Sequence, residues 1–78
     1  MPDGNDRTLV DLKPGESGVV RGISGDASFK RRLSALGLVN GTKVSLSQTA
    51  PMGDPRAYEV FDYILSLRNT EAGLVLLK

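Results

Sequence analysis

Residues 31–41 read Arg-Arg-Leu-Ser-Ala-Leu-Gly-Leu-Val-Asn-Gly, and they decide the fold because they predict where the clearest helix of the chain ends. The helix is expected to begin near Asp26, whose carboxylate is a good N-cap for the first free backbone amides. Phe29, Leu33 and Leu36 follow at spacings i, i+4 and i+7, which predicts a single buried stripe. A helix of about ten residues is too short to be stable alone, so this stripe must pack against a sheet.

The same stretch also predicts a sharp exit from the helix. Gly37 supplies the left-handed residue that ends it, and Leu38 is placed to fold back on Leu33 in a Schellman motif. Gly41, which follows Asn40, then favours a tight turn with positive φ into the next strand. We therefore interpret Gly37 and Gly41, like the three residues of the stripe, as parts of the architecture.

Short runs of β-branched or alternating apolar residues predict about five strands around this helix. The runs are 17–23, 42–47, 57–61, 64–68 and 74–77. Gly22 predicts a bulge in the first run, and Asp62-Tyr63 is the expected hairpin turn between the third and the fourth. Short strands with hairpin spacing predict a mainly β fold with one inserted helix, closed or nearly closed as a small barrel.

The chain has 78 residues, which allows one small domain. We expect a frayed N-terminus over 1–8 and a single domain over 9–78, with Leu9 and Leu12 as its first core contacts. The net charge of +1 creates no strong field to attract nucleic acid or an anionic membrane. The first residues lack a signal-peptide pattern, and no apolar run reaches the roughly 20 residues that span a bilayer. We therefore expect a cytoplasmic protein without membrane insertion.

The sequence contains no His and no Cys, and this limits its chemistry. Tight sites for late divalent metals normally use those ligands, and the carboxylates of Asp54, Glu59, Asp62 and Glu71 have no recognisable chelating spacing. A serine nucleophile would have no histidine as its base. The prediction is a protein that is not an enzyme and that has no cofactor and no metal site.

One dense charge cluster, Lys30-Arg31-Arg32, lies on the predicted helix. One interpretation is a solvated helix face that keeps a small protein soluble. The other is a docking patch, in which Arg31 and Arg32 contact an acidic surface of a partner. A nucleic-acid site is disfavoured, because it would need more positive charge and exposed aromatic residues interleaved with it.

The loop 50–55, Ala-Pro-Met-Gly-Asp-Pro, is a second candidate for contact with a partner. Its two prolines stiffen the backbone, which lowers the entropy lost on docking. The candidate partner-binding residues here are Pro51, Met52 and Asp54, and we add Leu38 from the helix end. In the alternative interpretation Met52 packs on the end of the barrel and Leu38 serves only to end the helix.

Residues 74–77 form the last predicted strand and are apolar on both faces. One pair, either Leu74 with Leu76 or Val75 with Leu77, would then face outward. This pattern leaves weak formation of homo-oligomers open.

Three segments, taken in order, resemble the ferrous iron transport protein A (FeoA) family. They are Arg-Arg-Leu-x-x-Leu-Gly-Leu-x-x-Gly-x-x-Val over 31–44, Ala-Pro-Met-Gly-Asp-Pro over 50–55, and Leu-x-Leu-Arg-x-x-Glu-Ala over 65–72. The likeness runs over nearly the whole chain. One departure is Asp62, which stands at a hairpin position where the family often has Gly.

This resemblance implies an SH3-like small β-barrel with the helix inserted after the first strand. It also implies a cytoplasmic accessory protein of bacterial ferrous iron uptake, whose partner is a large membrane permease with a cytosolic GTP-binding part. We therefore expect an interaction module that docks on that part and modulates it. The alternative is a small protein that itself binds ferrous or other divalent metal ions, which the lack of His and Cys disfavours.

Overall fold

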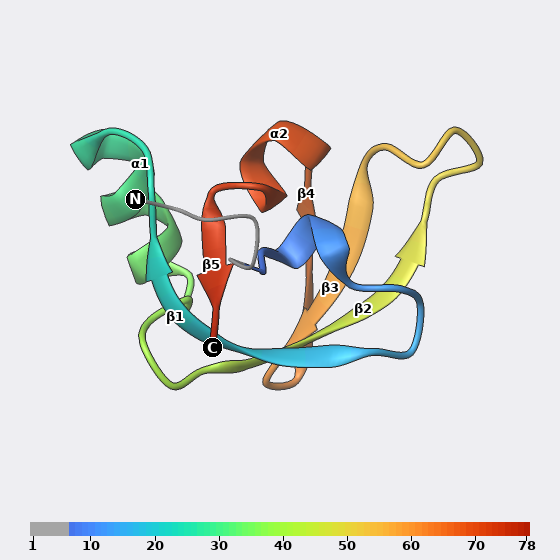
Figure 1. The fold of residues 1–78 in the computed structure, drawn as a ribbon, viewed down its shortest axis with the longest axis horizontal. Coiled ribbons are helices and arrows are strands. Elements are labelled where there is room, and N and C mark those ends of the chain that lie inside the picture. The colour runs from blue at the N-terminus through green and yellow to red at the C-terminus, as the bar shows by residue number, and fades with distance from the viewer. Residues whose placement is uncertain (1–6) are drawn as a thin grey trace.

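The computed structural model of the protein describes residues 7–78, in which five antiparallel strands form one curved sheet (Figure 1). The strands are β1 (Ser17–Ile23), β2 (Lys43–Thr49), β3 (Arg56–Val60), β4 (Tyr63–Leu67) and β5 (Val75–Leu77). The helical segments in this part of the chain are a short 3-10 turn, η1 (Leu9–Asp11), the longer α1 (Ala27–Ala35) and the single turn α2 (Asn69–Ala72). The predicted mainly β fold, with one helix inserted after the first strand, is confirmed.

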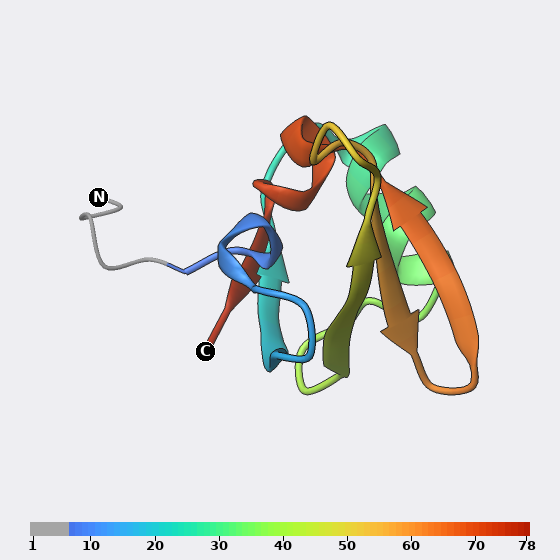
Figure 2. The same ribbon diagram turned by 90° about the vertical axis from the view of Figure 1, so that its right-hand side faces the viewer.

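β1 is the strand on which the sheet turns back on itself. The sheet order is β4-β3-β2-β1-β5, so β1 has a neighbour on each side. Its residues 17–19 pair with β2, whereas Val20, Gly22 and Ile23 pair with β5. The register shifts between Val20 and Gly22, which confirms the predicted bulge. Because β1 changes partners along its length, the sheet curls and its two edges approach α2 from either side (Figure 2).

α1 begins and ends as the sequence predicts. At its start, the Asp26 carboxylate accepts a hydrogen bond of 2.8 Å from the Phe29 amide. At its end, the Leu38 amide donates to the Leu33 carbonyl at 3.0 Å, and Gly37 between them has φ +96°. This is the Schellman geometry, in which a left-handed residue turns the chain so that the next side chain returns to the helix. Leu33 and Leu38 are both fully buried.

The predicted buried stripe is wrong at Leu36, whose side chain is 36% exposed. The helix has already ended there: Leu36 is the C-cap, with φ −86° and ψ 1°. Leu38, beyond the glycine, takes the place in the core next to Leu33 that the helical spacing assigned to Leu36. Phe29 is partly buried and packs against the core. The Leu36 main chain is nevertheless used, because its carbonyl accepts a hydrogen bond from the Tyr63 hydroxyl.

The turn between β3 and β4 lies at Phe61-Asp62, one residue earlier than predicted. Val60 pairs with Tyr63, which leaves only these two residues for the loop. Alternate residues of β4, beginning with Tyr63, turn their side chains toward the core, so the strand begins at Tyr63. Phe61 consequently has φ +54°, which a bulky side chain rarely adopts. Its ring lies against the end of α1, where a Cβ added to Gly37 would come within 3.0 Å of it.

The core fills the inside of the curled sheet. Its buried apolar residues are Leu9, Leu12, Val20, Leu33, Leu38, Val44, Leu46, Tyr58, Val60, Leu67, Ala72, Val75 and Leu77. The predicted first contacts, Leu9 and Leu12, are therefore confirmed. Both are also fixed through their main chains: the Tyr58 hydroxyl donates to the Leu9 carbonyl at 3.0 Å, and Arg56 donates to the Leu12 carbonyl at 2.9 Å.

The segment expected to be frayed, 1–8, lies mostly outside the described residues, which begin at Arg7. Arg7 and Thr8 make backbone contacts with β5. Thr8 forms a β-bridge with Leu76, and the Leu77 amide donates to the Arg7 carbonyl at 2.8 Å. These two residues therefore cover the outer edge of β5.

Candidate functional site

α1, α2 and the loop between β2 and β3 lie along one edge of the molecule, at the top of Figures 1 and 2. We call this the helix–loop edge; it comprises residues 27–35, 50–55 and 69–72. Two carboxylates join its parts. Asp54 accepts a hydrogen bond of 3.0 Å from the Asn69 amide, which ties the loop to the start of α2. Glu71 pairs with Arg32 at 2.7 Å, which ties α2 to α1.

Glu71 is the point at which the two helices meet. One of its carboxylate oxygens accepts the Arg68 amide at 3.0 Å, and the other accepts the Arg32 guanidinium. The backbone hydrogen bond from Arg68, followed by the bond to and charge of Arg32, lowers the pKa of Glu71 below its ordinary value despite its partial burial. The guanidinium of Arg32 also lies 5.4 Å from the centre of the Phe29 ring. Arg32 is thus engaged within the fold.

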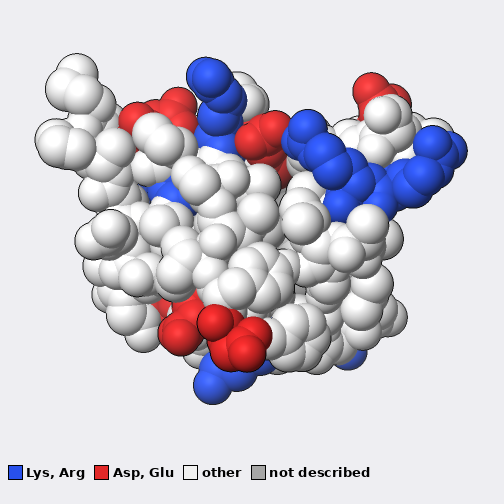
Figure 3. Space-filling model, turned by 180° about the vertical axis from the view of Figure 1, so that it is seen from behind, with Lys and Arg blue, Asp and Glu red and all other residues white. Residues whose placement is uncertain are grey.

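Arg31 differs from its neighbour Arg32. It is exposed, and no hydrogen bond or ion pair engages its side chain within residues 7–78. Lys30 is exposed on the same helix. Figure 3 shows that basic side chains gather along the upper rim of the molecule, with acidic side chains between them. Of the two arginines predicted to contact a partner, Arg31 is therefore the one whose charge is available.

The loop presents Met52 to solvent. Its side chain is 91% exposed, so the alternative in which Met52 packs on the end of the barrel is wrong. Pro51, beside it, is also exposed. The Ala50 amide donates to the Pro55 carbonyl at 3.0 Å, which closes the base of the loop. An exposed, flexible apolar side chain on a closed loop suits contact with an irregular partner surface.

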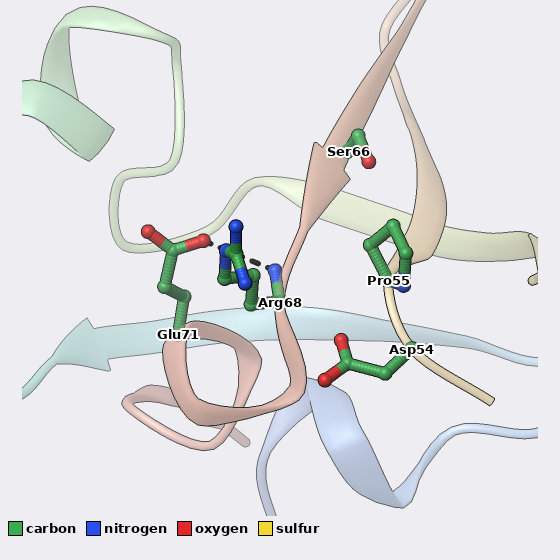
Figure 4. A pocket seen from close by; sticks show the side chains of 5 residues that line it. All are labelled: Asp54, Pro55, Ser66, Arg68 and Glu71. Atoms are coloured by element: carbon green, nitrogen blue, oxygen red, sulfur yellow. Dashed lines mark hydrogen bonds between the residues drawn. The ribbon is translucent and has the colours of Figure 1, made fainter. Parts of the chain in front are cut away.

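A pocket of about 360 Å³ opens in the helix–loop edge (Figure 4). It is lined by Asp54, Pro55, Ser66, Arg68 and Glu71. In Figure 4 the Arg68 side chain lies beside the Glu71 carboxylate, while Asp54 faces the turn that enters α2. Ser66 contributes the only hydroxyl, and it makes no hydrogen bond to a carboxylate within residues 7–78. The pocket offers polar recognition by charges of both signs and lacks a paired nucleophile and base.

The structure does not bring all the predicted contact residues together. Arg31, Pro51 and Met52 are exposed on the helix–loop edge, and Asp54 is used to cap α2. Leu38 is fully buried, so its prediction as a partner contact is wrong. The Schellman turn that the sequence predicts for it is what removes it from the surface.

Three exposed apolar residues are not singled out by the sequence pattern: Val39 is 48% exposed, Phe61 is 70% exposed and Ile64 is 56% exposed. Phe61 was interpreted as the end of a strand, whereas it lies in the turn. The alternation of β4 could have indicated Ile64, because Leu65 and Leu67 on either side of Ser66 assign the opposite face to the core.

Groups that could hold a metal ion are not assembled in the part of the chain that the structure describes: no three Asp or Glu residues come together there. Likewise, no helix among residues 7–78 is long and apolar enough to cross a membrane.

Comparison with known proteins places these observations in a family. The model of the FeoA domain family matches residues 7–78 of this chain. An Fe(2+) transport protein A/Fe(2+) transporter FeoB fusion protein of Porphyromonas gingivalis is 33% identical over 67 residues. That match covers 86% of this chain and 8% of the fusion protein, so this chain spans a small part of the relative's length.

Solved structures agree in fold. The FeoA-like protein of Clostridium acetobutylicum is 33% identical with a TM-score of 0.83, over 94% of this chain and 85% of that one. The FeoA of Stenotrophomonas maltophilia, described as a prokaryotic SH3 domain protein complexed with zinc, is 30% identical with a TM-score of 0.82. It is matched over 92% of this chain and 89% of that one. The predicted SH3-like barrel is confirmed.

Proposed function

Because this chain belongs to the FeoA domain family, which acts in ferrous iron transport, we propose that it is a cytoplasmic accessory protein that docks on a ferrous iron transporter. The partner is the cytosolic GTP-binding part of a large bacterial membrane permease, whose transport the docked protein modulates. The observation that carries this proposal is the Porphyromonas gingivalis fusion of transport protein A with FeoB in one chain. Fusion gives two modules a high effective concentration, so contact between them is favoured.

The helix–loop edge is the surface that we assign to docking. Met52 supplies an apolar contact that is 91% exposed before docking, so its burial would be favourable. Arg31 supplies a positive charge that fits an acidic patch on the partner. The closed loop and the two carboxylate links hold these groups in one arrangement, so little conformational entropy is lost on binding.

Modulation requires that the protein bind one state of the permease more tightly than another. The Stenotrophomonas maltophilia relative has been suggested as a ferrous iron transport activating factor, which supports a positive effect. The chain itself has no histidine to act as a base, so hydrolysis of GTP is assigned to the partner and no catalytic role to this protein.

Direct binding of ferrous ion is the other candidate function, and no observation favours it here. The zinc of the Stenotrophomonas maltophilia structure belongs to that protein. In this chain the carboxylates of residues 7–78 are not grouped as a set of metal ligands.

The test is a binding measurement with the purified cytosolic part of the permease, with GTP and with GDP. Met52→Ala and Arg31→Glu are the docking variants, and Lys43→Glu, on β2, is the control for a change of charge. We expect Met52→Ala and Arg31→Glu to weaken binding and Lys43→Glu to leave it unchanged. If the wild-type protein does not bind, the proposed function is wrong. If it binds and both docking variants bind equally well, the function stands and the assigned surface is wrong.

A further inference from the structure

Within residues 7–78, β4 forms an edge of the sheet that lacks the usual protection. Edge strands are normally short, charged, bulged, interrupted by proline or covered by another segment. β4 reads Tyr-Ile-Leu-Ser-Leu, without charge or proline, and its register with β3 runs over all five residues without a shift. In Figure 2 it is the outermost strand on the right. The opposite edge, β5, has only three residues and is covered by Arg7 and Thr8.

The hydrogen-bonding groups on this edge can be assigned from the hairpin. Val60 and Tyr63 close a two-residue turn, so they form a hydrogen-bonded pair, and such pairs alternate along an antiparallel ladder. The main-chain groups of Ile64 and Ser66 therefore face away from β3. Within residues 7–78 they make no backbone hydrogen bond to a turn or loop. Each carries one donor and one acceptor for a neighbouring strand.

The charges at the two ends of β4 indicate what that neighbour is. Asp62 precedes the strand and Arg68 follows it, each three residues from Leu65. We propose that β4 pairs antiparallel with β4 of a second copy of this chain, about a two-fold axis at Leu65. In that register Ile64 of each copy faces Ser66 of the other, and their outward main-chain groups form four hydrogen bonds.

The same register matches side chains. Asp62 of each copy lies opposite Arg68 of the other, so both ends of the strand pair gain an opposite-charge contact. The two Ile64 side chains, each 56% exposed, become diagonal neighbours on one face and cover each other. Figure 3, which views the side on which β4 lies, shows a broad, largely uncharged area between an acidic cluster below and an upper rim on which basic and acidic side chains both lie. An antiparallel partner brings the Asp62 end of one strand to the Arg68 end of the other.

The contact is small, so we expect a weak dimer whose population depends on concentration. Sedimentation equilibrium between micromolar and millimolar protein measures it, and hydrogen–deuterium exchange at the same concentrations locates it. We expect the amides of Ile64 and Ser66 to exchange more slowly as the fraction of protein in the dimer rises. A protein that stays monomeric at millimolar concentration would overturn the proposal. A dimer that leaves these two amides unprotected would overturn it as well.

Charge reversal tests the register. Asp62→Lys and Arg68→Glu each place like charges opposite one another at two points of the dimer, so each should weaken association on the order of tenfold. The double variant restores opposite charges and should recover most of the wild-type affinity. Lys43→Glu, on β2, is the matched control and should have little effect. If the double variant is no tighter than the single variants, the register is wrong.

Ile64→Lys tests the edge without touching either charged residue. Because Ile64 is 56% exposed, the monomer should keep its melting temperature, while a lysine on the edge should abolish pairing. Undiminished association of Ile64→Lys would overturn the proposal.

Discussion

The guanidinium of Arg32 lies 2.7 Å from the carboxylate of Glu71, and this ion pair joins α1 to α2 across 39 positions of sequence. Glu71 uses its second oxygen to accept the Arg68 amide, so one side chain both caps α2 and holds α1 beside it. The Arg32 side chain is 58% exposed and that of Glu71 is 28% exposed, so solvent screens the pair. Its role is to fix the relative position of the helices more than to stabilise the fold.

We predict that Glu71→Gln lowers the free energy of unfolding by about 1 kcal/mol or less, as for other solvent-screened pairs. The variant keeps an oxygen for the Arg68 amide and loses the charge that pairs with Arg32. Because the folded protein lowers the pKa of Glu71, its contribution is present at neutral pH. It is lost as the pH falls below the ordinary pKa of Glu, about 4.3, through the lower folded value.

The measurement is urea unfolding at neutral pH and at about pH 3. The difference in stability between these two conditions should be smaller in Glu71→Gln than in the wild type. Glu59→Gln, which removes a carboxylate from the exposed face of β3, is the control and should not reduce that difference as much. Equal pH dependence in the wild type and Glu71→Gln would contradict the role assigned to the carboxylate.

Tyr58→Phe should cost about 1–2 kcal/mol, because it leaves the Leu9 carbonyl without the hydroxyl that donates to it at 3.0 Å. The Tyr58 side chain is fully buried, so water cannot easily replace that donor. Burial also raises the pKa of Tyr58, against the opposing effect of Arg56. A phenol with a raised pKa contributes stability below its unfolded pKa of about 10 that is lost as the pH rises toward the folded value. The variant should therefore lose less stability than the wild type between neutral and strongly alkaline pH in chemical denaturation.

The end of α1 could be predicted from the sequence because it is a local event. Asp26, Gly37 and Leu38 act on residues no more than five positions away, and the hydrogen bonds that they predict are present. The error at Leu36 has the same origin. The spacing from Phe29 and Leu33 treats Leu36 as a helical residue, whereas Gly37 directly after it predicts that the helix ends there.

The candidate site was less predictable because its links are distant in sequence. Arg32 pairs with Glu71, and Asp54 accepts a hydrogen bond from the Asn69 amide; no local sequence pattern predicts either contact. From the sequence, Arg32 and Asp54 are therefore expected to be available for a partner, whereas in the structure both are bonded within the fold. Met52, by contrast, lies in a loop rich in proline and glycine, and its exposure follows from that composition.

Alanine substitutions should separate the two leucines that flank Gly37. Leu38→Ala should lower the free energy of unfolding by about 2–5 kcal/mol, because its side chain is fully buried and its removal leaves a cavity. Leu36→Ala should cost about 1 kcal/mol or less, because its side chain is 36% exposed and neighbouring groups can close over it. Urea unfolding checks both values: the midpoints give the two losses of stability, provided that the m-values are unchanged. Equal losses would mean that Leu36 belongs to the core after all.

Three glycine-to-alanine variants should separate two contributions to the loss of stability, backbone strain and side-chain contact. Gly41 has φ +96° and nothing within 4 Å of an added Cβ, so Gly41→Ala should show the cost of the left-handed conformation alone, about 1–2 kcal/mol. Gly37 has the same φ, but an added Cβ would lie 3.0 Å from the Phe61 ring, so Gly37→Ala should cost more. Gly22 has neither constraint, and Gly22→Ala should change the melting temperature least. Because the Phe61 ring is the group that the added Cβ would meet, Phe61→Ala should remove the excess cost of Gly37→Ala over Gly41→Ala. An excess that persists in Phe61→Ala would show that the ring is not its cause.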